Sequence, residues 1–216
     1  MVKASNNLSF FKDTGDKKAA DPLYYESAAY KDGYNMVAGI DEAGRGPLAG
    51  PVVSAAVIMP KGLIIPGVKD SKKMSEKARE KAFLEIIKNA LAVGIGVVSH
   101  SYIDKHNILT ASLESMKVAV DHLDITPDFL LIDGIFKIQN PLPQKCIVKG
   151  DQLSHTISAA SVIAKVYRDR IMSVYDRSCP EYEFIKNKGY GTKQHLTAIK
   201  KYGPSPFHRM TFKGVY

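Results

Sequence analysis

The sequence lacks the features that would place a protein in or across a membrane. No hydrophobic run approaches the roughly 18 apolar residues that span a bilayer. The N-terminus, which reads Met-Val-Lys-Ala-Ser-Asn-Asn, has no apolar segment of the kind found in secretory signal peptides. We therefore expect a cytoplasmic protein with no membrane partner.

Cysteine is scarce, and several common ligand motifs are absent. The two cysteines, Cys146 and Cys179, form neither a close pair nor a metal-ligand pattern, and the six histidines show no zinc spacing. The glycines within residues 44–50 are spaced wrongly for a dinucleotide fingerprint, and no Gly-x-x-x-x-Gly-Lys-Ser/Thr run exists. These absences argue against a disulfide framework, a structural zinc site and both nucleotide-binding motifs.

Acidic residues are missing from residues 184–216, whereas the whole chain has 30 Lys and Arg against 22 Asp and Glu, a formal net charge of +8. The basic residues of this tail are Lys186, Lys188, Lys193, Lys200, Lys201, Arg209 and Lys213, and its rings include Tyr190, Tyr202, Phe207, His208 and Phe212. A surface of one charge sign with aromatic rings favours a nucleic-acid partner. A basic tail that serves only solubility is the alternative.

The apolar pattern predicts one compact α/β domain with a tail, since 45% of the 216 residues are hydrophobic. Apolar or β-branched runs predict strands over 36–41, 51–59, 92–99, 129–132 and 146–148, the first three of them antiparallel. Helical spacing predicts helices from residue 75 to about 90, over 110–123 and over 153–175, with a short one over 23–30.

Three of the predicted strands end in acidic residues. The strand over 36–41 ends on Asp41 and Glu42. The strand over 129–132 is followed by Asp133, and the strand over 146–148 is followed, after two intervening residues, by Asp151. The carboxyl ends of strands in open α/β sheets are where ligands bind. Neighbouring side chains on a strand point to opposite faces, so we expect the backbone to turn sharply after Asp41. A solvated turn at this place, and an N-terminal helix cap at Asp151, are the structural alternatives.

The four acids indicate a metal site. Carboxylates that share a site repel one another unless cations neutralise them, and their hard oxygens favour Mg²⁺ or Mn²⁺. Two such ions about 4 Å apart support in-line phosphoryl displacement. Beside them, Gly44, Arg45 and Gly46 expose main-chain groups and a guanidinium to which a phosphodiester can come close. A Ser-Lys nucleophile at Ser71 is less consistent with the sequence than an exposed basic loop.

These segments together resemble bacterial ribonuclease HII, the type 2 ribonuclease H, over residues 36–212. The matching segments are 39–52, 70–73, 131–134, 149–151, 158–169, 188–190 and 208–209. The resemblance implies a ribonuclease H-like fold, with a five-stranded mixed sheet flanked by helices and a helical C-terminal portion. It implies an extension of unknown role over 1–35, a catalytic core over 36–178, and a basic helical portion over 179–216 that completes the substrate groove.

The resemblance also implies roles for individual residues. The catalytic, metal-binding residues are Asp41, Glu42, Asp133 and Asp151. The residues expected to bind substrate are Gly44, Arg45 and Gly46 at the ribose 2′-hydroxyl, Tyr190 at the next, deoxy, nucleotide, and Lys72, Ser158, Lys165 and Arg209. Asp169 either supports the acidic site or forms an ion pair with Arg168 or a neighbouring Lys. Met210 and Thr211 depart from the family pattern and weaken the case for a second cation there.

The implied activity is that of a monomeric, Mg²⁺- or Mn²⁺-dependent endonuclease. Its substrates would be RNA–DNA hybrids and duplex DNA with embedded ribonucleotides, cut 5′ of the ribonucleotide to leave 3′-hydroxyl and 5′-phosphate ends. Residues 1–35 are too short for the extra domain of the sister type, ribonuclease HIII. Two rival functions remain open, namely a nuclease of this fold that cuts DNA and a non-catalytic module that binds through the basic tail.

Overall fold

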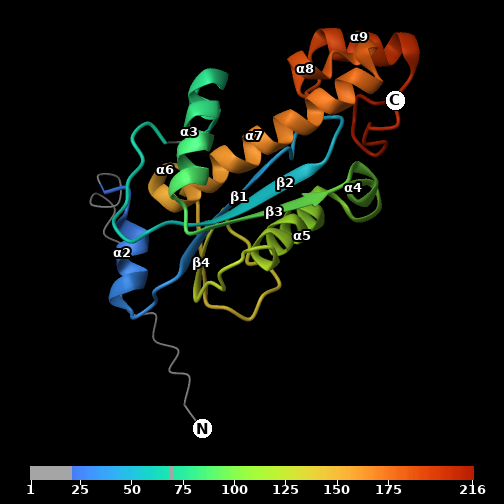
Figure 1. The fold of residues 1–216 in the computed structure, drawn as a ribbon. Coiled ribbons are helices and arrows are strands. Elements are labelled where there is room, and N and C mark those ends of the chain that lie inside the picture. Colours follow the sequence, from blue (N-terminus) through green and yellow to red (C-terminus); the bar gives the residue numbers. More distant parts are fainter. Residues whose placement is uncertain (1–20, 69–70) are drawn as a thin grey trace.

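The computed structural model describes residues 21–68 and 71–216, and a single mixed sheet lies at its centre (Figure 1). The strands are β1 (Val37–Ala43), β2 (Val52–Ile58), β3 (Ala92–Val98), β4 (Phe129–Asp133) and β5 (Gln144–Ile147). Their order is β3-β2-β1-β4-β5. β1, β2 and β3 pair antiparallel, whereas β4 pairs parallel with both β1 and β5. The predicted five-stranded mixed sheet and its antiparallel first half are therefore confirmed.

Helices cover both faces of this sheet, as predicted. The helices are α2 (Tyr24–Lys31), α3 (Glu76–Asn89), α4 (His100–His106), α5 (Ile108–Asp121), α6 (Gly150–Leu153), α7 (His155–Ser178), α8 (Phe184–Asn187) and α9 (Lys193–Tyr202), with short 3₁₀ turns at Ser71–Lys73 and Pro180–Tyr182. Figure 1 shows α7 crossing one face with α3 beside it, while α5 lies against the other face.

The core has one apolar layer on each side of the sheet. On the α7 side, Ala55 and Val57 of β2 pack with Ile86 of α3 and Ile163 of α7. On the α5 side, the cluster joins β1, β2 and β4 to Met116 and neighbouring residues of α5. Side chains that alternate along the strands therefore feed both layers, which explains the continuous apolar runs in the sequence.

Two glycines allow the long helices to approach the sheet closely. A Cβ at Gly39 in β1 would collide with the backbone of Thr156 in α7, and one at Gly96 in β3 would collide with the backbone of Ser115 in α5. Both helices therefore rest directly on strand backbone. At Gly39, this close packing brings the first turn of α7 beside β1, two residues before Asp41.

Several predicted boundaries differ from the structure. β5 lies at Gln144–Ile147 rather than 146–148, and α4 was not predicted. The helix predicted over 153–175 is α7, which runs from His155 to Ser178, whereas the short α6 before it, ending at Leu153, was not predicted. Ser154 between them is in an extended conformation, and its side chain caps α7 by accepting a hydrogen bond from the Ile157 N–H. The break therefore makes α6 a separate turn of helix.

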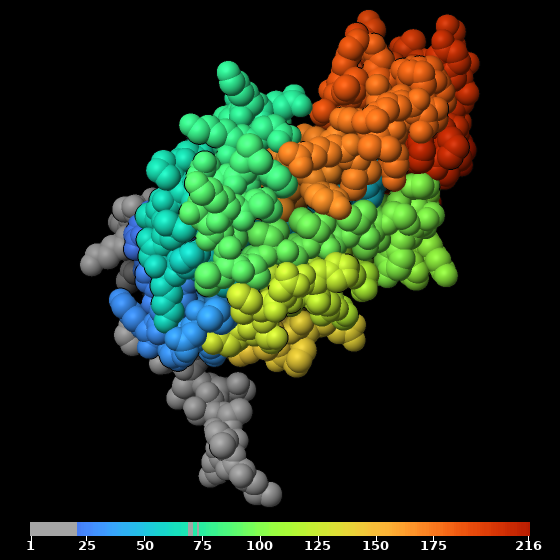
Figure 2. Space-filling view, viewed as in Figure 1, coloured from blue at the N-terminus to red at the C-terminus, as the bar shows by residue number. Residues whose placement is uncertain are grey.

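The C-terminal portion lies at the far end of α7, and α2 lies near its beginning (Figure 1). In Figure 2, α3 in teal and the C-terminal portion in orange and red stand as two projections with a depression between them. None of the helices in the described parts of the chain is long and apolar enough to cross a membrane. Residues 69 and 70, the second of which begins the matching segment 70–73, lie outside the described residues.

Candidate active site

The four acids come from three elements that meet at one edge of the sheet. Asp41 and Glu42 lie in β1, Asp133 is the last residue of β4, and Asp151 is in α6. In the parallel β1–β4 pair the last registered partners are Ile40 and Ile132. Asp41 and Asp133 each follow directly after that pair, so the sheet topology itself places them side by side. The expected convergence at the carboxyl ends of strands is observed for these two residues.

The predicted turn after Asp41 is wrong. β1 continues to Ala43, and β2 pairs with it opposite both Asp41 and Glu42. Asp41 therefore faces α7, while Glu42 faces α5 and lines a hollow of about 230 Å³ together with Asp133. Asp41 and Glu42 can nevertheless serve one site, because β4 ends at Asp133 and does not cover the last residues of β1 on the side away from β2.

Burial and mutual repulsion raise the pKa values of both acids in β1. Asp41 is 2% exposed. Burial is the largest cause that raises the pKa of its carboxyl well above the usual range, and the negative charges of Glu42 and Asp133 raise it further. Burial also raises the pKa of Glu42, although Arg45 opposes that shift. Uncompensated negative charge at this edge is therefore unfavourable, and a cation would relieve it.

Hydrogen bonds and basic side chains fix the positions of the other carboxylates. The Gly150 N–H donates to Asp133 Oδ1 over 2.7 Å, which ties the end of β4 to α6. Lys72 Nζ lies 3.5 Å from Asp151 Oδ2, and Arg45 Nη1 lies 3.3 Å from Glu42 Oε1. Asp151 lies within α6, and Ser154 caps α7, so Asp151 is not the N-terminal cap of the long helix.

We call Asp41, Glu42, Asp133 and Asp151, at the carboxyl ends of β1 and β4 and in α6, the acidic edge. They have the chemistry of a hard-cation site. Asp41 Oδ1 accepts a hydrogen bond from the Glu42 N–H, but its buried Oδ2 has no hydrogen-bond partner among the described residues. As placed, no three acidic, His or Cys side chains in the described ranges come close enough together to hold a metal ion. The unpartnered carboxylate oxygen and the raised pKa values of Asp41 and Glu42 nevertheless fit Mg²⁺ or Mn²⁺.

The chain turns after β1 at Gly44, which starts the loop over residues 44–50. Gly44 has φ of +102°, and a Cβ there would collide with the Arg168 side chain. Arg168 is fully buried, and its guanidinium donates to the carbonyl oxygens of Ala49, Pro51 and Lys188. A glycine is therefore needed at position 44 both for the backbone conformation and for the arginine beside it.

Arg209 holds the same loop from the C-terminal side. It is 0% exposed, and its guanidinium donates four hydrogen bonds to carbonyl oxygens. The acceptors are Gly44, Arg45, Gly50 and Pro51. Burial and then Arg168 lower its pKa to about 9. The prediction that Arg209 binds substrate directly is wrong, because its donors face the protein and the side chain has no access to a ligand.

Tyr190 lies beside the loop although it is far away in the sequence. A Cβ at Gly46 would come within 3.8 Å of Tyr190 Cε1, and Tyr190 is 45% exposed. The loop and the tyrosine, which the resemblance assigns to one recognition device, are thus brought together. Arg45 is also exposed, so both side chains face solvent next to the acids.

Two buried histidines hold the Tyr190 backbone. The Ser205 N–H donates to His208 Nδ1, so His208 carries its proton on Nε2 and donates it to His195 Nε2 over 2.9 Å. His195 then donates through Nδ1 to the Tyr190 carbonyl. Burial lowers the pKa of both rings, that of His208 to about 4 with His195 adding to the shift. Both are neutral near pH 7, as this chain of bonds requires.

Two further predicted substrate contacts are internal. Ser158 is buried, and its hydroxyl donates to the carbonyl oxygens of Asp151 and Ser154. Lys165 is largely buried and donates to Asp169 over 2.6 Å. These internal bonds give no support to the predicted contacts of Ser158 and Lys165 with nucleic acid, which stay predictions. For Asp169, the ion pair with a neighbouring Lys is observed, and the pair with Arg168 is not.

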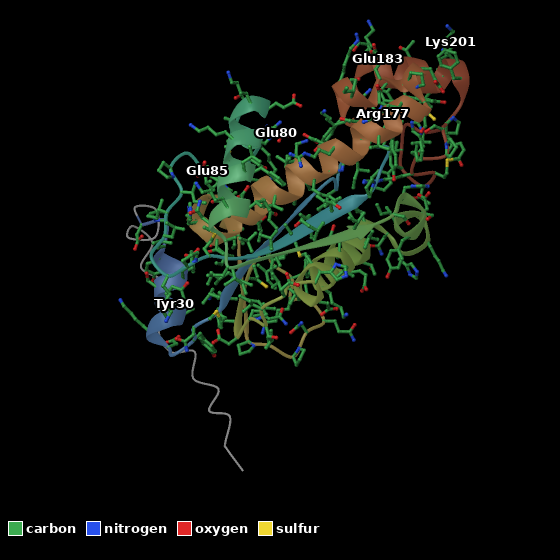
Figure 3. The ribbon with its side chains drawn as sticks, in the orientation of Figure 1. Tyr30, Glu80, Glu85, Arg177, Glu183 and Lys201 are labelled. Atoms are coloured by element: carbon green, nitrogen blue, oxygen red, sulfur yellow. The ribbon has the colours of Figure 1, made fainter. Side chains whose placement is uncertain are left out.

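The basic tail keeps five of its six lysines exposed, but not all of its rings. Lys186, Lys193, Lys200, Lys201 and Lys213 are exposed. Figure 3 shows Lys201 at the outer end of the C-terminal portion. Tyr202 is exposed, but Phe207 stacks on Tyr175 at 3.9 Å and His208 is buried. Phe207 and His208 therefore belong to the local core and cannot stack on bases.

Sequence reasoning missed the supports behind these surfaces. Arg168, His195 and the true role of Arg209 carry no signal in local spacing, because each acts on backbone carbonyls distant in the chain. The one available signal was the placement of Arg168 and Arg209 within matching segments. The resemblance predicts a substrate contact for Arg209 and none for Arg168, whereas both side chains are buried in the structure.

Comparison with known proteins agrees with this architecture. The Ribonuclease HII family matches residues 38–215. Ribonuclease HII of Syntrophus aciditrophicus (strain SB) is 56% identical over 190 residues, covering 88% of this chain and 90% of that protein. The crystal structure of ribonuclease H2 from Pyrococcus horikoshii OT3 has a TM-score of 0.71 at 28% identity, covering 84% of this chain and 95% of that one.

A more distant structure, Bst-RNase HIII in complex with Mn²⁺, shares the fold at 18% identity, with a TM-score of 0.64 over 87% of this chain and 70% of that one. The resemblance inferred from the sequence segments and the ribonuclease H-like fold are confirmed.

Proposed function

The chain belongs to the ribonuclease HII family and is an endoribonuclease, and from this premise we propose that it is metal-dependent and cuts RNA in RNA–DNA hybrids. It also cuts 5′ of ribonucleotides embedded in duplex DNA, leaving 3′-hydroxyl and 5′-phosphate ends. The observation that carries this proposal is the acidic edge, where Asp41 has a buried, unpartnered oxygen next to Asp133. We further propose that the protein works as a monomer in the cytoplasm.

Asp41, Glu42, Asp133 and Asp151 are the residues that hold the metal ions in this proposal. Bound Mg²⁺ or Mn²⁺ would supply an activated water and stabilise the leaving oxygen of an in-line displacement. The bond from Gly150 to Asp133 keeps two of the acid-bearing elements in register. Mn²⁺ is present in the Bst-RNase HIII complex, which supports a hard divalent cation here.

Recognition of the ribose belongs to the loop over 44–46 and to Tyr190. The loop can present main-chain groups to a 2′-hydroxyl, the group that distinguishes RNA from DNA. The exposed face of Tyr190 packs against the following sugar, where a second 2′-hydroxyl would interfere. Arg168 and Arg209 hold the loop in place by their bonds to its carbonyls.

The domain division predicted from the sequence becomes part of the proposal. Residues 36–178 form the catalytic core, and residues 179–216 complete the substrate groove with their exposed lysines. Lys72 remains a candidate for backbone contact, because its side chain is 74% exposed beside Asp151. Phosphate contacts of this kind position the duplex without reading its sequence.

An incision assay tests the proposal. Four end-labelled duplexes are used: one with a single ribonucleotide, an RNA–DNA hybrid, an all-DNA duplex and an RNA duplex. We expect cleavage of the first two with Mg²⁺, none with EDTA, and product ends that a 5′-phosphate-dependent exonuclease degrades. Cleavage of the all-DNA duplex would favour a DNA nuclease, and binding without cleavage in Mg²⁺ would favour a non-catalytic module. Either result would overturn the proposal.

A further inference from the structure

Glu26 in α2 is a buried carboxylate that reaches the beginning of α7. It is 0% exposed, and its Oε1 accepts hydrogen bonds from Ser154 Oγ over 2.6 Å and from the Thr156 N–H over 2.9 Å. Tyr25 and Ala29 on the same helix pack with the residues of β1, β4, β5 and α7 that form one apolar cluster. α2 therefore precedes the segment matched by the family, yet it is anchored in the core.

Ser154 is the joint between α6, which carries Asp151, and α7. Its N–H donates to the Gly150 carbonyl at the start of α6, and its Oγ accepts from the Ile157 N–H at the start of α7. Ser158 Oγ donates to the carbonyl oxygens of Asp151 and Ser154. All of these hydrogen bonds lie within one or two helical turns of Asp151. A shift of Ser154 would therefore move Asp151.

We propose that Glu26 is a positioning residue that sets the α6–α7 joint and so holds Asp151 in place for metal binding. The inference rests on the proposed role of Asp151. A four-residue helix cannot maintain itself, because forming one turn is unfavourable without outside support. A carboxylate suits the task, since it accepts from two donors at once and lies at the positive end of a 24-residue helix.

The contacts at the other end of α6 explain why a loss at Glu26 reaches the acidic edge. The Gly150 N–H donates to Asp133 Oδ1, so α6 is held by Asp133 on one side and by Ser154 on the other. The Pro22 carbonyl also accepts from the His155 N–H over 2.8 Å, which ties the start of α2 to the same joint. Without Glu26, the Ser154 hydroxyl and the Thr156 N–H would lose their buried acceptor.

The test measures Mn²⁺ binding by calorimetry, along with the Mg²⁺ concentration that gives half-maximal cleavage. The variants are Glu26→Ala, Glu26→Gln and Ala29→Gly, the last as a control that weakens α2 but removes none of the hydrogen bonds at the joint. We expect Glu26→Ala to raise the Mn²⁺ dissociation constant about 10- to 100-fold, as loss of a group supporting a ligand does. Glu26→Gln keeps an oxygen acceptor and should restore most of the affinity, and Ala29→Gly should change it less than about threefold.

Equal Mn²⁺ affinity in Glu26→Ala and Ala29→Gly would overturn the proposal. If Glu26→Ala does not fold by circular dichroism, Ser154→Ala replaces it, because it removes the same link from the opposite side and should weaken Mn²⁺ binding similarly. Asp41→Asn serves as the reference for the acidic edge. Unchanged Mn²⁺ binding in Asp41→Asn would refute the proposed metal site. Weaker Mn²⁺ binding in Asp41→Asn, together with unchanged binding in Glu26→Ala and Ser154→Ala, would refute only the role of Glu26.

Discussion

Replacement of Asp41 by Asn should change stability and activity in opposite directions. In the metal-free protein the ionised carboxylate is buried with one oxygen unpartnered among the described residues, beside Glu42 and Asp133. A buried polar group left unsatisfied costs about 1–3 kcal/mol. The amide of Asn would itself keep an unsatisfied polar group there, but it carries no charge. Asp41→Asn should therefore raise the free energy of unfolding by about 1.4 kcal/mol for each unit by which the folded protein raises the Asp41 pKa. For a chain of this size, each kcal/mol raises Tm by about 2–4 °C.

The stability difference should depend on pH with a definite sign. Burial and neighbouring acids raise the pKa of Asp41 in the folded state above its unfolded value. The penalty for ionising it is therefore absent below the unfolded pKa, near about 4, and grows as the pH rises through the folded pKa. Urea unfolding of the metal-free proteins should give similar free energies near the unfolded pKa and a growing advantage for Asp41→Asn above it.

Activity should fall because Asp41→Asn removes the negative charge that binds the metal ion, the same charge whose loss raises stability. An anionic ligand contributes several kcal/mol to charge stabilisation in a metal site, and each 1.4 kcal/mol is about tenfold in rate. We expect kcat on an RNA–DNA hybrid to fall at least about a thousand-fold. Mn²⁺ at 100 times its dissociation constant should stabilise the wild type by about 2.7 kcal/mol, and at the same concentration it should stabilise Asp41→Asn much less.

The matched control is Asp121→Asn, because Asp121 is an acid with a 46% exposed side chain that pairs with Lys117. It is the last residue of α5, beyond the part of that helix that lines the hollow beside Glu42. It should leave turnover and Mn²⁺ stabilisation unchanged. Near-normal turnover in Asp41→Asn would mean that the acidic edge is not the catalytic site. Lower stability of metal-free Asp41→Asn would mean that Asp41 is a structural hydrogen-bond acceptor rather than a buried charge that neighbouring acids destabilise.

Three other variants test the surfaces around this edge. Tyr190→Ala should lower kcat/KM about ten- to a hundred-fold on a one-ribonucleotide duplex, from a loss of about 1–3 kcal/mol of packing, and less on a long hybrid, whereas Tyr202→Ala should not distinguish the two. Equal losses would make Tyr190 a general binding residue. Lys200→Ala with Lys201→Ala should flatten the plot of log affinity against log salt by about 0.9 for each lysine that binds a phosphate, equally on DNA and hybrid; an unchanged slope would exclude these lysines from binding. Arg209→Leu should lower the free energy of unfolding by about 3–5 kcal/mol, because buried carbonyls lose their donors. A weaker affinity for substrate at unchanged stability in urea would instead support its predicted role in binding substrate.

The sequence by itself determined the elements and the identity of the reacting groups. Apolar runs ending in Asp133, and helical spacing after Ser75, depend on neighbours in the chain and can be recognised locally. Ser75 does cap α3, by accepting a hydrogen bond from the Ala78 N–H. The ordered set of matching segments identified the family, and with it the fold, because so many spaced matches do not arise from composition alone.

Only the tertiary structure decided what those groups face. β1 continues past Asp41 because β2 supplies a partner from residues that lie beyond the next turn. Arg209 carries a charge whose partners are carbonyl oxygens of the distant loop over 44–50 and Pro51, and the sequence contains no record of its burial. The role of Glu26 likewise depends on a hydrogen bond to Ser154, 128 residues away. Charge at a position can be read from one residue, but its use depends on solvent access and on partners that folding brings together.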